Sequence, residues 1–428
     1  MRHTLANRRI MMISFVAALL LQTAAMIVGI VFLALPISSE EDSVEYIRTA
    51  DNVVAVHRFS IEQAPPFRPN GFRTPGPLFL NIPLRLLSFK NDIVAALISR
   101  LMLILGGVLC VAIAADLRID KYALLAGTLY ILAPTMFYYS MLAYSTELPY
   151  SIACGLLELG TVLYLSKGNR GGVVLILLSS LYALWLRPAA LFVLIAYTGS
   201  CVLASVVTKQ ELRRRVLIAA AMCLFGTFVA YTAWCYRNYV AFNDFEYSTV
   251  SGENLLKWNA RAMEPFLDSG GRQDLSDSLK KYPIKLQRYS GADQFALADQ
   301  EAKEGVRLIF KYPIPFLESH LRGTLISAFI FRPAAVRSRP SAVILMSAVH
   351  CSYLLLGALG LILVYGTLNV SQRTALLIIV FVGVVSLLSG GALYSPRFRI
   401  PLDIVLVVGA TNCIARIEAW MLTCGVSQ

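Results

Sequence analysis

The sequence is short of charged residues, which make up 15% of the chain, whereas hydrophobic residues make up 57%. Soluble domains carry about 25% charged residues. Apolar runs of roughly 20 residues, the length that crosses a bilayer as a helix, recur along the chain. The sequence lacks the alternating pattern of barrel strands. Because only helices and closed barrels satisfy their backbone groups in lipid, we predict an all-α protein with many membrane spans.

Other absences narrow the kinds of site. The 8 cysteines include no C-x-x-C pair and most lie in apolar runs, so we infer neither a disulfide framework nor a zinc site. His57, His320 and His350 lack metal-ligand spacing. No P-loop or Rossmann fingerprint occurs, which favours a reaction without a nucleotide. Lys and Arg at cytoplasmic span ends explain the net charge of +12, so we infer no nucleic-acid partner.

Ten segments are long and apolar enough to be spans. The first is longer than the apolar core of a signal peptide, so we interpret it as an uncleaved span. The expected spans are 10–36, 92–115, 121–141, 145–165, 171–186, 189–207, 215–235, 342–366, 373–394 and 401–420.

The short connections between spans predict the orientation. If the ten spans alternate, Lys167, Arg213 and Arg373 fall on one side with the other basic connections, and that side is cytoplasmic. We therefore treat residues 1–428 as one membrane domain with two outer loops, 37–91 and 236–341. Interfacial helices are expected in both loops, and the second has little of a hydrophobic core of its own.

The segment "GTLISAFIF" at 323–331 is a short apolar run inside the second loop. It is either an eleventh span or a helix lying in the membrane interface. We favour the interfacial helix, because the run is short and bounded by Arg322 and Arg332. A span here would move the motif "YSPRFRIPLD" at 394–403 to the cytoplasm.

Acidic residues follow the first span directly. Glu40, Glu41 and Asp42 begin an expected helix, and Asp51 lies further along it. A carboxylate at the membrane edge can act as a general base towards an acceptor hydroxyl or amine. The alternative is an acidic first turn that only stabilises the helix dipole.

Arginines recur at the predicted outer surface. A guanidinium can grip phosphate oxygens with two hydrogen bonds and stays charged, whereas a single arginine at a membrane edge more often snorkels to water. Snorkelling explains Arg187 poorly, because this residue lies in a short outer turn where cations are disfavoured. The candidates for phosphate binding are Arg73, Arg187, Arg237, Arg397 and Arg399.

The local sequence sharpens the prediction for one pair of these arginines and adds an acidic candidate. Pro396 and Pro401 favour an extended turn, in which Arg397 and Arg399 point to one face and could grip one headgroup. Glu147 begins a span and is expected to pair with one of the arginines, which makes it a further candidate for the binding site. Glu158 lies deeper in the same helix, without a predicted partner.

Six motifs in order resemble the GT-C class of membrane glycosyltransferases. Within that class they resemble the group of dolichyl-phosphate-mannose–protein mannosyltransferases and the bacterial lipid A aminoarabinose transferase. The motifs are "EDSVEYIRTADNVV", "RTPGPLFL", "MLAYSTELPYSIACGLLELG", "LWLRPAALFVL", "WCYRNYVAFNDFEYSTVSGENLLKWN" and "YSPRFRIPLD".

The resemblance implies a GT-C fold and an inverting transfer of sugar from a polyprenyl-phosphate carrier to a lipid, glycan or protein acceptor on the non-cytoplasmic face. It implies that Asp42 is the catalytic base, with Glu41 the nearest substitute, and that Asn254 in "SGENLLKWN" contacts the sugar. The arginines named above would bind the carrier phosphate, Arg73 among them.

The resemblance leaves other properties open. Some relatives use a divalent metal and others do not, and we identify no metal ligands or other cofactor. The bacterial inner membrane is the expected location, and the endoplasmic reticulum stays open.

Two other classes of function fit the sequence. A transporter or flippase of lipid-linked saccharides would move its substrate without breaking a bond, and would favour charged residues through the membrane interior. A non-catalytic assembly subunit would tolerate the loss of both Asp42 and Arg187. The charges here cluster on the outer side, which favours the transferase.

Overall fold

The computed structural model describes residues 16–18, 20, 24, 41–87, 92–117, 119, 122–140, 142, 144–282, 293–330, 340–391 and 395–423. Apart from a few helical positions, the predicted first span at 10–36 lies outside these residues. The described part of the chain is all helix and turn, without strands, as predicted.

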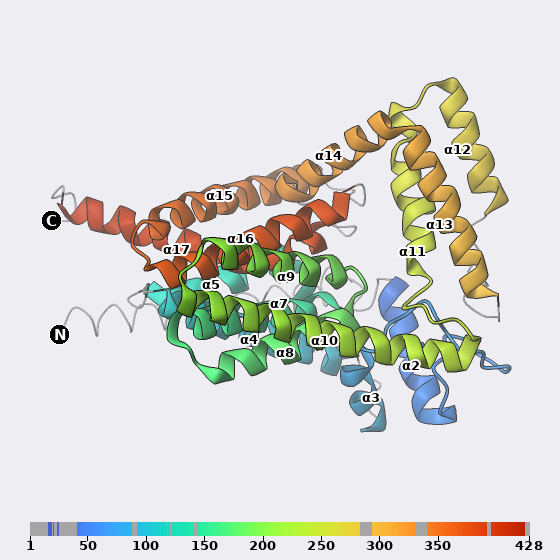
Figure 1. Cartoon of the computed structure of the whole chain (residues 1–428), viewed down its shortest axis with the longest axis horizontal. Helices are drawn as coiled ribbons and strands as arrows, with labels where there is room; N and C mark the ends of the chain where they lie inside the picture. Colours follow the sequence, from blue (N-terminus) through green and yellow to red (C-terminus); the bar gives the residue numbers. More distant parts are fainter. Residues whose placement is uncertain are drawn as a thin grey trace.

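The other nine predicted spans coincide with helices that run side by side along the long axis (Figure 1). Seven of them are long and apolar enough to cross a membrane by themselves, so the protein is an integral membrane protein. The helices that make up all nine spans are α4 (Asp92–Asp116), α5 (Ala123–Leu132), α6 (Pro134–Ser140), α7 (Glu147–Lys167), α8 (Arg170–Leu186), α9 (Ala190–Val207), α10 (Gln210–Phe242), α15 (Pro340–Tyr365), α16 (Val370–Gly390) and α17 (Ile400–Thr423).

Two of the predicted spans are irregular. The segment 121–141 is a bent pair, α5 and α6, with an angle of 60° between them. Pro134 begins α6, and because proline lacks an N–H it cannot continue the hydrogen bonding of α5. Helix α8 is apolar throughout but has only 17 residues.

The short connections are made by residues suited to end or begin a helix. Helix α7 ends at Gly168, whose φ of 67° lies in the left-handed region that glycine adopts readily. Asn169 then caps α8 by accepting a hydrogen bond from the amide of Gly171. Helix α16 begins with a capping box, in which Asn369 and Gln372 satisfy each other's backbone amides.

Residues predicted to face the cytoplasm gather at one end of the bundle. Lys167 pairs with Asp116, Gln372 donates to the Asp116 carbonyl at 2.8 Å, and Arg215 donates to the Leu165 carbonyl at 3.1 Å. We call this the basic end. The two predicted outer loops lie at the opposite end, which we call the loop end, so the alternation of the described helices is as predicted.

The first loop folds into two helices at the loop end. They are α2 (Glu41–Val56) and α3 (Leu78–Leu86), which pack against each other (Figure 1). Arg85 of α3 pairs with Asp51 of α2 at 3.1 Å. The amide of Gly76 donates to the Trp185 carbonyl at 2.9 Å and so ties the loop to the end of α8.

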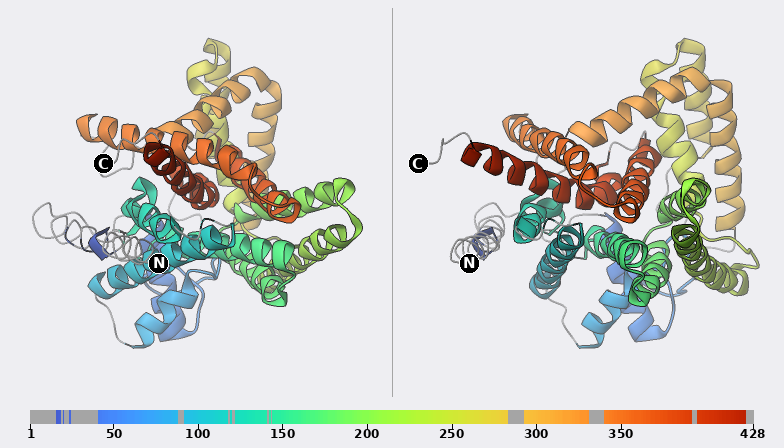
Figure 2. Two further views of the ribbon diagram at one scale, coloured as in Figure 1. Left: turned by 90° about the vertical axis from the view of Figure 1, so that its left-hand side faces the viewer. Right: turned by 60° about the vertical axis from the view of Figure 1, so that its left-hand side comes forward.

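The second loop begins later than predicted, because α10 continues to Phe242. It contains α11 (Val250–Glu253), the π-helix η2 (Asn254–Ala260), the 3₁₀ helix η3 (Glu264–Phe266), α12 (Ser269–Lys281), α13 (Gln294–Lys311) and α14 (Pro313–Phe329). We call residues 250–282 and 293–311 the outer module. Figure 2 shows it from two further sides, in yellow to orange, against the membrane helices.

The outer module has a small core of its own. Its buried side chains come from η2, α12, α13 and the segments between them, and they are Leu256, Ala260, Met263, Leu267, Leu275, Tyr282 and Leu308. These apolar positions are spread thinly over a polar stretch of sequence. They form a core only because the fold brings η2, α12 and α13 together.

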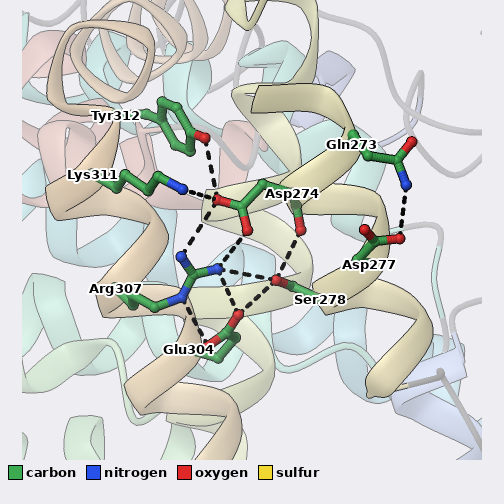
Figure 3. A network of polar contacts seen from close by, with 8 residues as sticks. All are labelled: Gln273, Asp274, Asp277, Ser278, Glu304, Arg307, Lys311 and Tyr312. Carbon is green, nitrogen blue, oxygen red and sulfur yellow. Dashed lines mark hydrogen bonds and ion pairs between the residues drawn. The ribbon is translucent and has the colours of Figure 1, made fainter. Parts of the chain in front are cut away.

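A polar network holds α12 against α13 (Figure 3). Asp274 of α12 accepts hydrogen bonds from Arg307 at 2.9 Å, from Lys311 at 2.8 Å and from the Tyr312 hydroxyl at 3.1 Å. The hydrogen bonds from Arg307 and Lys311 hold the pKa of Asp274 well below its usual range. Each ion pair is partly exposed and contributes little to stability alone. The network therefore stabilises the contact between α12 and α13 through the number of its interactions.

Helix α14 contains most of the segment 323–331. It leaves the end of α13 and runs obliquely towards the membrane helices (Figure 1). Its C-terminal end contacts the bundle, where the Ala328 carbonyl oxygen lies 2.7 Å from Nε2 of His350 on α15. Among the described helices α14 is not a candidate span by length and composition.

Helices α15 and α17 cross closely at small residues. A side chain on Gly360 of α15 would run into the backbone carbonyl of Gly409 on α17. By contrast, Gly199 of α9 is exposed and faces open space. The two positions form a matched pair for substitution.

We expect Gly360→Ala to destabilise the protein by about 1–3 kcal/mol, because the added methyl group must push two packed helices apart. Gly199→Ala should leave stability unchanged or slightly raised, because alanine favours the helix. Thermal unfolding of the two variants in detergent measures the difference. Equal unfolding temperatures would contradict the close crossing.

Candidate functional site

Arg73 of the first loop holds two carboxylates of α2. Its Nη2 lies 2.6 Å from Oδ1 of Asp42 and its Nε lies 2.5 Å from Oε2 of Glu45. The two acids are three residues apart on one face of the helix, so one guanidinium reaches both. The rings of Phe72 and Tyr46 lie 4.6 and 5.4 Å from the guanidinium carbon and complete its surroundings.

Arg397 approaches Asp42 from the other side. It belongs to the 3₁₀ helix η7 (Pro396–Arg399), and its Nη1 lies 3.6 Å from Oδ2 of Asp42. Asp42 therefore lies between Arg73 and Arg397, with one carboxylate oxygen towards each. The Asp42 side chain is 40% exposed and that of Arg397 is 29% exposed, so a ligand can reach both.

Arg187 lies in the turn between α8 and α9, as expected, and pairs with Glu147. Its Nη1 is 3.1 Å from Oε1 of Glu147, whose side chain is only 2% exposed. Ser145 donates to the other carboxylate oxygen at 2.7 Å. The guanidinium lies 5.9 Å from the ring of Phe398, the residue after Arg397. The pairing expected for Glu147 is thus present, and it directs Arg187 towards η7.

The pKa values of Asp42 and Glu45 shift in opposite directions. Burial acts to raise the pKa of Asp42, but the charges of Arg73, Arg397 and Arg187 outweigh it and lower that pKa below its ordinary value. Burial is also the largest influence on Glu45. There Arg73 offsets only part of it, and the charges of Asp42 and Glu253 add to it, so the pKa of Glu45 is raised. Asp42 is therefore the acid that stays ionised.

The outer module reaches this acidic pair through α11. Glu253, whose charge acts on Glu45, ends α11, and Asn254 begins the π-helix η2. The Asn254 carbonyl accepts a hydrogen bond from Nδ2 of Asn259 at 2.8 Å. Single turns of π-helix are frequent at functional sites. The structure therefore places Asn254 half-buried, in the segment beside the acidic pair.

Arg237 does not join Asp42 directly. Its Nη1 donates to the Asn70 carbonyl and to Oδ1 of Asn238, both at 2.8 Å. The rings of Phe59, Trp234 and Phe242 lie within 5.5 Å of its guanidinium carbon. The Asn70 side chain in turn accepts from the amide of Arg73 at 3.0 Å. Arg237 thus acts on the site through the loop that carries Arg73.

Arg399 is fully buried and bonded within the protein. Its Nε donates to Oδ1 of Asp403 at 2.8 Å, its Nη1 to the Ser327 carbonyl at 2.8 Å, and its Nη2 to the Thr135 hydroxyl. The expectation of an extended turn at 396–401 is wrong. Residues 396–399 form a 3₁₀ helix, in which positions two apart point in different directions, so only Arg397 faces Asp42.

A further acid on α2 falls outside the site. Asp51 pairs with Arg85 of α3. Glu41 begins α2, and its side chain lies outside the described residues. Glu45 is not among the residues predicted from the sequence, although its spacing of three residues from Asp42 on an expected helix is a usable signal. In the described part of the chain, no group of three or more His, Cys, Asp or Glu side chains could hold a metal ion.

The chain resembles a known protein in its fold and not in its sequence. No family model and no curated protein matches the chain. The solved structure of the oligosaccharyltransferase of Archaeoglobus fulgidus, with a tethered acceptor peptide, superimposes with a TM-score of 0.53 at 14% identity. The chain has the GT-C type of fold. The match covers 97% of this chain and 51% of the neighbour, so this chain spans about half the neighbour's length, and the likeness concerns the fold alone.

We expect Arg399→Met to destabilise the protein by about 3–5 kcal/mol, because it leaves Asp403 as a buried charge without its partner. Adding Asp403→Leu should recover part of the loss. Arg397→Met, two residues away and partly exposed, should change stability little. Unfolding in detergent measures all three variants, and an equal loss for Arg397→Met and Arg399→Met would contradict the assignment.

Proposed function

We propose that this protein is an inverting membrane glycosyltransferase, which moves a sugar from a polyprenyl-phosphate carrier to a lipid, glycan or protein acceptor. One observation carries the proposal: Asp42 is ionised, accessible and held between Arg73 and Arg397 at the loop end. The GT-C type of fold and the order of the sequence motifs support it. The solved neighbour is an oligosaccharyltransferase, which agrees with this class of chemistry.

In the proposed reaction Asp42 accepts the proton of the acceptor hydroxyl or amine as that group attacks the anomeric carbon. The bond from the anomeric carbon to the carrier phosphate oxygen breaks, and the phosphate leaves with the electron pair. Arg397 and Arg187 stabilise the charge that develops on the phosphate. Attack from the opposite side of the leaving group inverts the anomeric centre.

Donor binding would also strengthen the base. In the free protein Arg73, Arg397 and Arg187 lower the pKa of Asp42. A phosphate bound by Arg397 and Arg187 neutralises part of their charge and adds negative charge nearby, which raises the pKa of Asp42. The carboxylate becomes a better proton acceptor once the donor is in place.

The remaining candidates have supporting roles in this proposal. Glu147 orients Arg187, and Arg237 and Arg399 position the segments that carry Arg73 and Arg397. Asn254 is the proposed sugar contact, because η2 lies beside the acidic pair. Glu41 stays the substitute for Asp42 as base.

The loop end is proposed to face the non-cytoplasmic side, in agreement with the cations at the basic end. For a bacterial protein that is the periplasmic side of the inner membrane.

A transporter or flippase of lipid-linked saccharides is the second candidate. Glu158 favours it, because this acid is buried among membrane helices and its Oε2 has no hydrogen-bond partner among the residues that the structure describes. Intramembrane acids often mark transport pathways. Recovery of an unchanged glycolipid on the far side of liposomes would support this candidate over the transferase.

Asp42→Asn should reduce transfer about 10²–10⁴-fold, the usual contribution of a general base. The assay follows radiolabelled sugar from polyprenyl phosphate to acceptors in membranes that contain the variant. Asp51→Asn is the matched control, because it makes the same change on the same helix at an acid paired outside the site, and it should retain activity. Normal transfer by Asp42→Asn would rule out the proposed base.

The pH profile should show the donor's effect on Asp42. The acid limb of kcat/KM reports the free enzyme and the acid limb of kcat reports the enzyme–donor complex. Because bound phosphate raises the pKa of Asp42, the limb of kcat should lie at higher pH than that of kcat/KM. Arg397→Met should bring the two limbs closer together. Coincident limbs in the unaltered protein would contradict the coupling.

A further inference from the structure

The outer module contains a cavity that shares no lining residue with the Asp42 site. Its volume is ≈ 360 Å³, within the range of small-molecule sites. One wall is α12 and the other is the segment between η2 and η3. The described residues that line it are Arg261, Glu264, Arg272, Leu275, Ser276, Leu279, Lys280 and Tyr282.

The cavity uses the face of α12 opposite to the polar network. At 100° per residue, Asp274 and Ser278 point towards α13, whereas Arg272, Ser276 and Lys280 form a ridge on the far side. Figure 3 shows the Asp274 face engaged with Arg307 and Lys311. The ridge is therefore not needed to hold the module together.

The charge around the cavity is positive and largely uncompensated. Among the described lining residues, three cations stand against one carboxylate, Glu264. Within the described residues, no ion pair joins Arg261 or Arg272 to a carboxylate, and Lys280 has only a 3.8 Å contact with exposed Asp277. Such a set of cations attracts an anion and can donate several hydrogen bonds to it.

The floor of the cavity is apolar. Leu275 and Tyr282 are buried and belong to the small core of the module, and Leu279 packs against it. A free phosphate would need only the cations, and an uncharged sugar would need none. Cations at the rim above an aliphatic and aromatic floor suit a ring with an apolar face and an anionic substituent.

We propose that this cavity binds an anionic saccharide, a sugar that carries a phosphate or a carboxylate. It is a second ligand site, and it does not depend on the function proposed for Asp42. The anion could belong to a soluble glycan or to the headgroup of a lipid. Both present the same chemistry to Arg261, Arg272 and Lys280.

The test uses the full chain in phosphatidylcholine nanodiscs. Binding of glucose 6-phosphate, glucuronate and glucose is titrated by saturation-transfer NMR. The two anionic sugars should bind in the millimolar range, and more weakly at high salt, because the rim is exposed. Glucose should bind at least fivefold more weakly. Equal binding of all three, or no binding, would overturn the proposal.

Variants locate the binding. Arg261→Ala with Arg272→Ala should weaken glucose 6-phosphate binding at least fivefold, and Glu264→Gln should tighten it about twofold by removing a like charge. Lys303→Ala is the matched control, because Lys303 is an exposed cation of α13 outside the cavity, and it should change nothing. An equal effect of Lys303→Ala would indicate surface charge alone and overturn the proposal.

A last experiment distinguishes a soluble glycan from a lipid headgroup as the source of the anion. Phosphatidylinositol, a lipid with a phosphorylated ring headgroup, is added to the nanodiscs. Displacement of glucose 6-phosphate by it would support the cavity as a site for a membrane-borne saccharide. Unchanged binding of glucose 6-phosphate would support a soluble one.

Discussion

The bridge from Arg73 to Asp42 and Glu45 is the interaction on which the site depends. One partly buried guanidinium satisfies two carboxylates that would otherwise repel each other across one helical turn. The bridge is itself supported from α10, because Arg237 holds the Asn70 carbonyl while the Asn70 side chain holds the amide of Arg73. The membrane helix α10 thereby determines the position of the Asp42 carboxylate in the first loop. This support keeps Asp42 directed towards Arg397.

Arg397 and Arg399 show how strongly local geometry divides the roles of neighbouring residues. Both are arginines within one four-residue helix, yet Arg397 meets Asp42 and Arg399 is enclosed by Asp403, Ser327 and Thr135. A buried guanidinium is tolerated only where its donors are satisfied. Arg399 joins α14, α6 and α17 at one point, which holds η7 in place and keeps Arg397 beside Asp42.

The sequence was sufficient for most of the fold, because a run of about 20 apolar residues has few alternatives to a membrane helix. It also predicted that Asp42, Arg187 and Arg397 lie at one end. It could not predict the partners of Arg399, since Thr135 and Ser327 are ordinary polar residues far away in the chain. Nor did it reveal the core of the outer module, whose leucines are too sparse to form a periodic pattern. Such features depend on tertiary contacts that no local pattern records.

The segments around Asp42 lie far apart in the chain, and this has a consequence for biosynthesis. The acidic helix α2 and Arg73 leave the ribosome early, Arg187 follows midway, and Arg397 comes only with the last helices. N-terminal parts of a chain fold first during synthesis. A partly inserted chain thus carries Asp42 first with Arg73 and then with Arg187, but without Arg397. Arg397, the second ion-pair partner of the carboxylate, reaches it only when η7 and α17 have packed, so the site is completed only after these late segments have been made.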